Sequence, residues 1–202
     1  DYRLAPENKF PAALDDAVGG YRLLLEKGDR TDRIVIGGDS AGGGLTVATL
    51  IAIRECGLPL PAGAFLLSPW TDLAATGDSI IANDAVDPVL SGKLVHKLAE
   101  LYYGEDSPTN PLVSPLYADL KGLPPMRIYV SDTEILLDDS RRLAERAKQQ
   151  GVSVDLRIWH QLPHVWPIFV AFGIPESKAA FDEIVEFVKQ QTSLPQAKRT
   201  AA

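Results

Sequence analysis

Residues 33–45 read Arg-Ile-Val-Ile-Gly-Gly-Asp-Ser-Ala-Gly-Gly-Gly-Leu, and this stretch decides the fold. Its first part, residues 33–37, is a short run rich in β-branched residues, which is typical of a buried strand. Glycines follow, and then residues 45–53, which are apolar on nearly every face and indicate a buried helix. The sequence therefore predicts a strand, a tight turn and a helix, with Ser40 at the corner.

Ser40 fits the pattern of a nucleophile, because residues 38–42 match G-x-S-x-G. A serine at such a corner has strained backbone angles, and glycines around it leave room for the turn. The hydroxyl is then exposed above the sheet, and the start of the following helix stabilises negative charge on a substrate oxygen. We expect Ser40 to be the nucleophile and the backbone N–H of Ala41 to be an oxyanion donor.

A glycine-rich turn between strand and helix is also typical of phosphate-binding loops. Here Asp39 and Ser40 occupy positions where a G-x-G-x-x-G frame needs glycine. No Lys-Ser or Lys-Thr pair closes a Walker loop in this sequence. These details favour the nucleophile.

Three histidines are candidates for the general base. His96 lies in a predicted helix beside two lysines and is interpreted as a surface residue. His160 ends the last predicted strand, where a structural hydrogen bond to the backbone is an alternative role. His164 lies in a turn beyond the carboxyl end of that strand, which is the end where open α/β sheets bind ligands. We expect His164 to be the base, with His160 as the alternative.

A carboxylate has to orient the histidine and stabilise its protonated form. The acidic residues that follow the apolar run 126–131 are Asp132, Glu134, Asp138 and Asp139. The last two stand at the start of a predicted helix, where capping and first-turn positions explain them. Asp132 and Glu134 are therefore the candidates for the acid.

Other segments extend this unit along the chain. Further strands are predicted at residues 62–68, 126–131 and 152–159, and amphipathic helices at residues 10–26, 139–150 and 176–191. The last helix has a predicted buried stripe of Ala180, Phe181, Ile184, Val185 and Val188. Asp1 opens on what reads as the end of another strand. Alternating strands and helices indicate an α/β fold, with a mostly parallel sheet flanked by helices.

The chain length indicates a single domain over residues 1–195, since 202 residues suffice for one hydrophobic core. Residues 76–125 interrupt the alternation, are rich in Pro, Ser, Asp and Asn, and are predicted to form a cap-like insertion over the sheet. Residues 196–202 have little to bury and are expected to fray.

Composition excludes several classes of partner. The net charge is −7 and Lys and Arg are spread along the chain, so we expect neither nucleic acid nor an anionic membrane surface. Cys56 is the single cysteine, and no Cys/His cluster has metal-ligand spacing, so we expect no metal. No apolar run has membrane-spanning length and no signal-peptide pattern is present, so a cytoplasmic location is expected.

A series of motifs carries a family resemblance. In chain order they are DYRLAPE (1–7), FPAALDDA (10–17), GGDSAGGGL (37–45), SPWTDL (68–73), DPVLS (87–91), SPLYADLKGLPP (114–125) and PHVW (163–166). Together they resemble the bacterial hormone-sensitive-lipase-like (family IV) carboxylesterases of the α/β-hydrolase fold, through almost all of the chain. The resemblance implies hydrolysis of short-chain carboxylic esters through an acyl-enzyme intermediate, without a cofactor.

The resemblance also assigns residues. Ser40 matches the family's nucleophile, and His164 matches the histidine of its PH-aromatic loop. The acid is the first residue of a D-x-L-x-D-like pattern, here Glu134, which replaces the commoner aspartate. This departure keeps Asp132 and Asp138 as alternatives. Candidates for the acyl or alcohol pocket are Trp70, Leu136, Val165 and Trp166, together with Asp87 and Tyr102. Aromatic and aliphatic side chains are more often part of the core.

One family motif is absent from the sequence. The HGGG motif, which supplies further oxyanion donors, does not occur, and the first strands of the family's fold are missing as well. We therefore expect a longer esterase, and weak or no activity from the polypeptide as written, since loss of one oxyanion donor costs about 2.7–4 kcal/mol.

The alternative function is a non-catalytic small-molecule-binding protein on the same fold. Amidase or thioesterase activity is open too, and the alternating segment 152–159 offers an edge for a homodimer.

Overall fold

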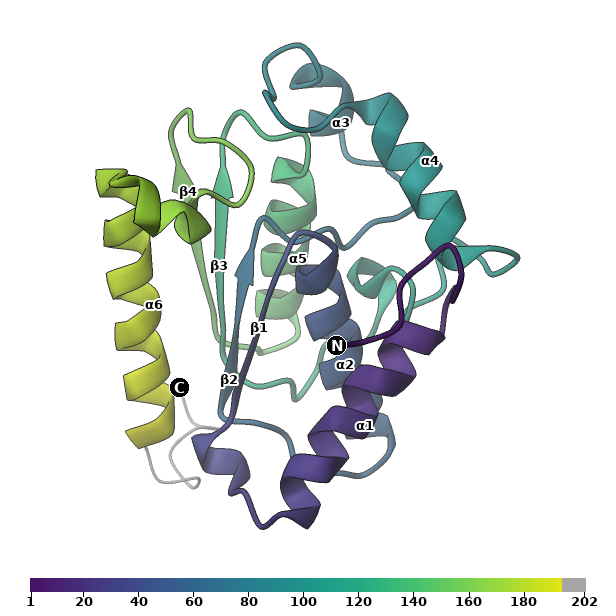
Figure 1. The fold of residues 1–202 in the computed structure, drawn as a ribbon, viewed down its shortest axis with the longest axis vertical. Helices are drawn as coiled ribbons and strands as arrows, with labels where there is room; N and C mark the ends of the chain where they lie inside the picture. The colour runs from purple at the N-terminus through teal and green to yellow at the C-terminus, as the bar shows by residue number, and fades with distance from the viewer. Residues whose placement is uncertain (194–202) are drawn as a thin grey trace.

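A computed structural model of the chain describes residues 1–193. Its centre is a four-stranded sheet in the order β1-β2-β3-β4, and every neighbouring pair is parallel. The strands are β1 (Val35–Asp39), β2 (Gly63–Leu67), β3 (Met126–Ser131) and β4 (Val154–Trp159). Because all four strands run the same way, their carboxyl ends meet at one end of the sheet (Figure 1).

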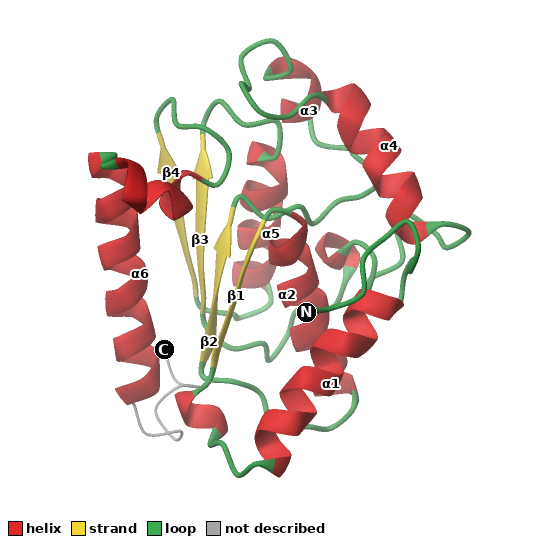
Figure 2. Cartoon of the chain, in the orientation of Figure 1, coloured by secondary structure: helices red, strands yellow, loops and turns green. Residues whose placement is uncertain are grey.

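Helices cover both faces of the sheet, which gives three layers (Figure 2). One face carries α1 (Ala12–Glu26), α2 (Ala41–Glu55) and α5 (Leu137–Gln149), and the other carries α6 (Pro175–Ser193). Apolar side chains of α2, α5 and the inner strands form the main core, with Leu50, Leu66, Ile128 and Leu143 almost completely buried. The predicted parallel sheet flanked by helices is confirmed.

The segment between β2 and β3 lies over the carboxyl ends of the strands (Figure 1). It contains α3 (Ser79–Ala82), α4 (Gly92–Tyr103) and the 3₁₀ turn η2 (Pro115–Tyr117). Ser91 caps α4 by accepting a hydrogen bond from the N–H of Leu94, and Gly104 ends the helix with a positive φ of 62°. A second apolar cluster, which includes Ile80, Val95, Ala99, Ile135 and Leu136, holds the segment on the domain.

The structure corrects three expectations about the elements. Residues 1–4 form no strand, and β1 begins and ends two residues later than predicted. The buried stripe of α6 contains Ala180, Ile184 and Phe187, whereas Phe181 is exposed. The predicted frayed tail, 196–202, lies outside the described residues.

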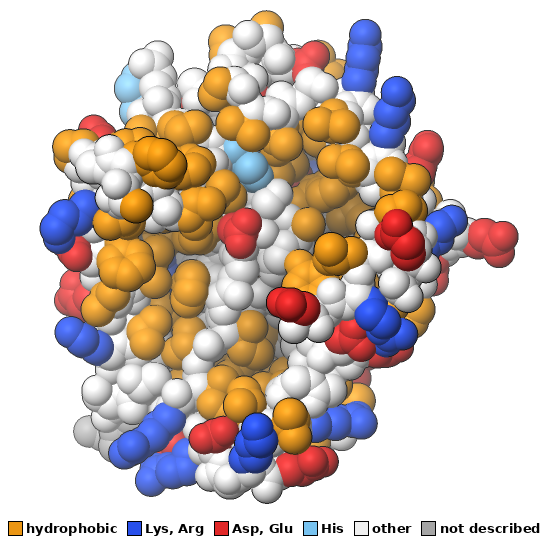
Figure 3. Space-filling model, viewed as in Figure 1, with side chains coloured by type: hydrophobic (Ala, Val, Ile, Leu, Met, Phe, Trp, Pro, Cys, Tyr) orange, Lys and Arg blue, Asp and Glu red, His pale blue; other side chains and the backbone are white. Residues whose placement is uncertain are grey.

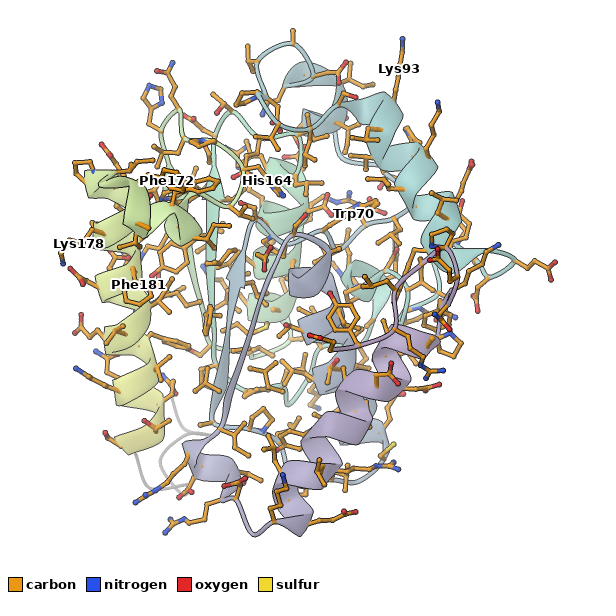
Figure 4. All side chains as sticks on the ribbon, viewed as in Figure 1. Trp70, Lys93, His164, Phe172, Lys178 and Phe181 are labelled. Carbon is orange, nitrogen blue, oxygen red and sulfur yellow. The ribbon has the colours of Figure 1, made fainter. Side chains whose placement is uncertain are left out.

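Exposed hydrophobic side chains gather where α6 meets the preceding 3₁₀ segment η3 (Trp166–Phe172). Ile168 and Phe172 on η3 and Phe181 on α6 are all solvent-exposed. Figure 3 shows hydrophobic atoms gathered on the side of the molecule where Figure 4 labels Phe172 and Phe181 beside α6. The amphipathic pattern of α6 is therefore broader than the stripe that packs on the sheet.

Candidate functional site

Ser40 stands at the corner between β1 and α2 in a strained conformation, with φ 51° and ψ −120°. Non-glycine residues seldom adopt a positive φ. The corner is held from β2 and the loop after it: the Ser40 N–H donates to the carbonyl of Leu67 (2.8 Å), and the Ser40 carbonyl accepts from the N–H of Trp70 (2.9 Å). These contacts fix the conformation that turns the serine out of the strand.

Glycines make the corner sterically feasible. A Cβ added to Gly38 would lie 2.2 Å from the carbonyl oxygen of Gly42, and one added to Gly44 would lie 2.0 Å from that of Trp70. At Gly43 a Cβ would meet a proline side chain at 2.7 Å. At Gly42 nothing lies within 4 Å. Gly38 and Gly44 are therefore required by the close approach of another backbone, Gly43 by the adjacent proline, and Gly42 by neither.

His164 and Glu134 form a buried pair. The imidazole Nδ1 lies 2.6 Å from Oε2 of Glu134, and the two side chains are 6% and 0% exposed. Oε1 of Glu134 accepts hydrogen bonds from the N–H of Ser131 (2.7 Å) and the hydroxyl of Ser68 (2.8 Å). These donors hold the carboxylate, and the carboxylate holds the ring with Nε2 directed away from it.

The other ring nitrogen of His164 is unpaired. Nε2 is buried and has no hydrogen-bond partner within residues 1–193, so no hydrogen bond joins it to the Ser40 hydroxyl in this structure. Catalytic hydrogen bonds commonly tighten only when substrate is bound. Figure 4 shows His164 and Trp70 at the same end of the sheet, where the strands end. The arrangement thus contains a formed acid–imidazole pair and an imidazole nitrogen that is available to a proton donor.

The alternative acids and bases have other partners. His160 Nδ1 lies 2.6 Å from Oδ2 of Asp132, and the His160 side chain is 76% exposed. Its ring therefore contacts a carboxylate and not the backbone group that a purely structural hydrogen bond would have used. Asp138 accepts a hydrogen bond from the N–H of Ser79 (2.9 Å). His96 is exposed on α4. The structure therefore brings together Glu134 and His164, and it places Asp132 and His160 in a separate, solvent-exposed pair.

An apolar cavity of about 280 Å³ adjoins the corner. Its lining includes Ala41 and Gly44 of α2, Trp70 and Leu73 of the loop after β2, and Leu98 and Tyr102 of α4. Ala41 is the first residue of α2, so its N–H is one of the donors that the helix itself leaves unpaired. The cavity thus connects an anion-stabilising helix end with an apolar wall.

The suggested pocket residues divide into two groups. Trp70 and Tyr102 line the cavity. Leu136 (1% exposed) and Trp166 (0% exposed) lie in apolar clusters and are not among the residues that line this cavity. Trp166 packs against the rings of Tyr129 and Trp159, and Val165 belongs to the same cluster. Asp87 accepts a hydrogen bond from the N–H of Ile135 (2.9 Å) instead of facing the cavity.

The insertion also binds the loop that carries Glu134. The Asn83 side-chain amide donates to the carbonyls of Asp132 (3.0 Å) and Glu134 (2.8 Å). The Ser79 hydroxyl donates to the carbonyl of Ile135 (2.7 Å). Sequence reasoning missed these contacts, because they join segments about 50 residues apart.

Asp139 lies in the first turn of α5, as expected, and its side chain also binds the loop after β2. It is 1% exposed, and its Oδ2 accepts hydrogen bonds from the N–H groups of Thr71 (2.7 Å) and Asp72 (2.8 Å). Burial raises the pKa of Asp139 to about 7, although these N–H groups oppose the effect. Asp139 therefore fastens the first turn of α5 to the loop whose Trp70 holds Ser40.

Within residues 1–193, no group of three or more His, Cys, Asp or Glu side chains is arranged to hold a metal ion. None of the helices in that part of the chain is long and apolar enough to cross a membrane.

Known proteins resemble both the sequence and the structure. The family model for the α/β-hydrolase fold matches residues 1–168. An acetyl-hydrolase of Streptomyces hygroscopicus is 42% identical over 191 residues, covering 95% of this chain and 64% of that protein. An esterase of Acinetobacter venetianus is 38% identical over 188 residues, covering 93% of this chain and 62% of that protein.

Solved structures agree with these relatives. The crystal structure of an esterase from the bacterial hormone-sensitive lipase family superposes with a TM-score of 0.93 at 51% identity, covering 95% of this chain and 64% of the other. This chain spans slightly less than two thirds of the length of these proteins. It belongs to the α/β-hydrolase fold family and, within that family, to the bacterial hormone-sensitive-lipase-like esterases.

Proposed function

We propose that the protein is a serine carboxylesterase that hydrolyses short-chain carboxylic esters through an acyl-enzyme intermediate, with Ser40 as nucleophile, His164 as base and Glu134 as acid. The observation that carries this proposal is the buried 2.6 Å contact between His164 Nδ1 and Glu134 Oε2. It lies at the same end of the sheet as the strained Ser40 corner. The two relatives, an acetyl-hydrolase and an esterase by name, support the same reaction class.

The proposed cycle uses these groups in turn. His164 Nε2 takes the proton of the Ser40 hydroxyl as its oxygen attacks the ester carbonyl carbon, and the carbonyl oxygen becomes an oxyanion near the Ala41 N–H. Glu134 stabilises the imidazolium through Nδ1–H. The imidazolium gives its proton to the departing alcohol, which leaves an acyl-Ser40 ester. Water, deprotonated by His164, then releases the carboxylic acid and restores the serine.

The apolar cavity beside Ala41 supports an ester with a short apolar part as substrate. A volume of about 280 Å³ accommodates a small acyl group, and its lining from α2, α4 and the loop after β2 is predominantly apolar. We assign Trp70 to this wall. The single-domain arrangement of residues 1–195, with residues 76–125 as the insertion that carries α4, is part of the same proposal.

A non-catalytic binding protein would use the same fold without activating its serine. Hydrolysis of p-nitrophenyl acetate and butyrate separates the two, with the protein expressed from its complete reading frame. Ser40→Ala is expected to lower kcat at least 10³-fold. Ser140→Ala is the control, because Ser140 lies outside the proposed triad and its buried hydroxyl has no partner among the described residues. Turnover by Ser40→Ala close to wild type would overturn the proposal.

We further propose that the protein is cytoplasmic and that two copies pair through β4. In the described sheet, β4 lies at the edge and has β3 as its single neighbour. An unpaired strand edge favours association with another strand. Light scattering of the complete protein tests this arrangement, and a monomeric mass would contradict it.

A further inference from the structure

Ser68 occupies an unusual position at the end of β2. It is completely buried, and its φ is 47°, a value that non-glycine residues rarely adopt. Its N–H donates to the carbonyl of Tyr129 on β3 (2.7 Å), so the backbone is firmly held. Glycine would fit this conformation more easily than serine, which directs attention to what the hydroxyl does.

The Ser68 hydroxyl uses both of its hydrogen-bonding capacities. It donates to Oε1 of Glu134 (2.8 Å) and accepts from the N–H of Val165 (3.1 Å), the residue directly after His164. The other oxygen of Glu134 contacts Nδ1 of His164 at 2.6 Å. One hydroxyl at the end of β2 therefore contacts both the carboxylate after β3 and the histidine loop after β4.

The backbone around Ser68 also holds the nucleophile. Leu67, directly before it, accepts the N–H of Ser40 (2.8 Å), and Trp70, two residues after it, donates to the Ser40 carbonyl (2.9 Å). The three groups assigned to the reaction are thus each fixed to residues 67–70. These groups are at positions 40, 134 and 164 in the sequence, and hydrogen bonds to residues 67–70 hold all three in place.

We propose that Ser68 is a positioning residue, whose hydroxyl orients the Glu134 carboxylate and the backbone beside His164 for proton transfer. This inference rests on the proposed function. Deleting the hydroxyl leaves the buried Val165 N–H without its partner and leaves one carboxylate oxygen with the Ser131 N–H as its remaining donor. The carboxylate then has more freedom to rotate, and the ring that it holds loses its fixed orientation.

Two substitutions separate the hydroxyl from the backbone conformation. Ser68→Ala and Ser68→Gly both remove the hydroxyl, but glycine also relieves the strain of the positive φ. A positioning role predicts the same loss in both variants: kcat falls by up to about 100-fold while KM changes less than about 2-fold. Ser140→Ala, the matched buried serine, keeps wild-type kcat. Wild-type kcat in Ser68→Gly, or a loss expressed in KM, would overturn the proposal.

A second measurement does not require turnover. Two-bond ¹H–¹⁵N correlation spectra report the protonation and hydrogen bonding of the His164 ring nitrogens. We expect the His164 signals to shift in Ser68→Ala and Ser68→Gly and to stay unchanged in Ser140→Ala, with thermal unfolding showing that each variant is folded. Unchanged signals in both Ser68 variants would overturn the inference. If Ser40→Ala instead retains esterase activity while these signals shift, the proposed function fails and the contact between Ser68 and Glu134 stands.

Discussion

Gly44 lies directly against the carbonyl oxygen of Trp70: a Cβ added to this glycine would be 2.0 Å from that oxygen. Trp70 in turn donates its N–H to the carbonyl of Ser40. The approach of α2 to the loop after β2 therefore sets the position of the Ser40 backbone. A glycine on α2 is required here by contact with another backbone and not by its own φ.

Gly44→Ala is expected to push the two backbones apart. Overpacking of this kind typically lowers the free energy of unfolding by about 1–3 kcal/mol, and it should also lower kcat because the Ser40 corner moves. Chemical denaturation and p-nitrophenyl butyrate hydrolysis measure the two effects. Gly42→Ala is the control, since nothing lies within 4 Å of its added Cβ. Equal behaviour of the two variants would show that the contact with Trp70 is unimportant.

The Ser40 corner was predictable because its determinants are local. A β-branched run, closely spaced glycines and an apolar helix encode the strand, turn and helix within about 20 residues. Local sequence was misleading at residues 1–4, which were expected to end a strand but form none in the described structure. Periodicity also placed Phe181 in the buried stripe of α6, yet this side chain is exposed and Phe187 is buried. Helical spacing indicates a face, but the width of the contact depends on what the helix meets.

The partners of the site residues were less predictable. Two carboxylates and two histidines follow β3 and β4, and each carboxylate contacts one histidine at 2.6 Å. Residue types alone could not separate the buried pair from the exposed pair, so the choice of Glu134 depended on a family resemblance. Ser68 and Asn83 contact the acid loop across 49 to 66 residues of sequence, a relationship that no local pattern encodes.

The buried carboxyl of Asp139 makes stability depend on pH. Burial raises its pKa to about 7 from an ordinary value of 3.8, so the folded state binds this proton more tightly than the unfolded state. The stabilisation of the folded state by the protonated Asp139 carboxyl is fully present below about pH 4. It is lost as the pH rises to about 7. The two pKa values differ by about 3 units, which corresponds to about 4 kcal/mol of unfolding free energy at about 1.36 kcal/mol per unit.

Asp139→Asn removes this titration. We expect the unfolding free energy of wild type minus that of the variant to fall by about 4 kcal/mol between pH 4 and pH 8, as measured by denaturant titration. Asp16→Asn is the control: hydrogen bonds from Arg3 lower the pKa of this carboxyl to about 2, so its effect lies below about pH 4 and the difference stays nearly flat between pH 4 and pH 8. Parallel pH curves for wild type and Asp139→Asn would contradict the prediction.

Asn83 connects the segment between β2 and β3 to the loop that carries Glu134. Asn83→Ala removes the two hydrogen bonds to the carbonyls of Asp132 and Glu134, and it should lower the unfolding free energy by about 1–3 kcal/mol. Because the Glu134 loop loses an anchor, kcat should fall as well, with KM less affected. Asn110→Ala serves as the control, since Asn110 bonds only within its own turn, to Asp106 and Leu112. A kcat loss no larger than that of the control would refute the connection.

The cavity wall on α4 predicts a change in acyl preference. Leu98 lines the cavity and is 41% exposed, so Leu98→Ala widens the space at a modest cost in stability. The ratio of kcat/KM for p-nitrophenyl octanoate over butyrate should rise by up to about 10-fold. Leu94→Ala, on the same helix with a similar exposure but outside the lining, should leave the ratio unchanged. An unchanged ratio in Leu98→Ala would mean that this cavity does not hold the acyl chain.

The most direct test of the proposed triad is covalent labelling of the complete protein with a fluorophosphonate, followed by mass mapping of the peptides. The account predicts one adduct, on the Ser40 hydroxyl, formed at least 100-fold more slowly in His164→Ala because the base no longer activates the serine. An adduct on another residue, or labelling of Ser40 at the same rate without His164, would contradict it.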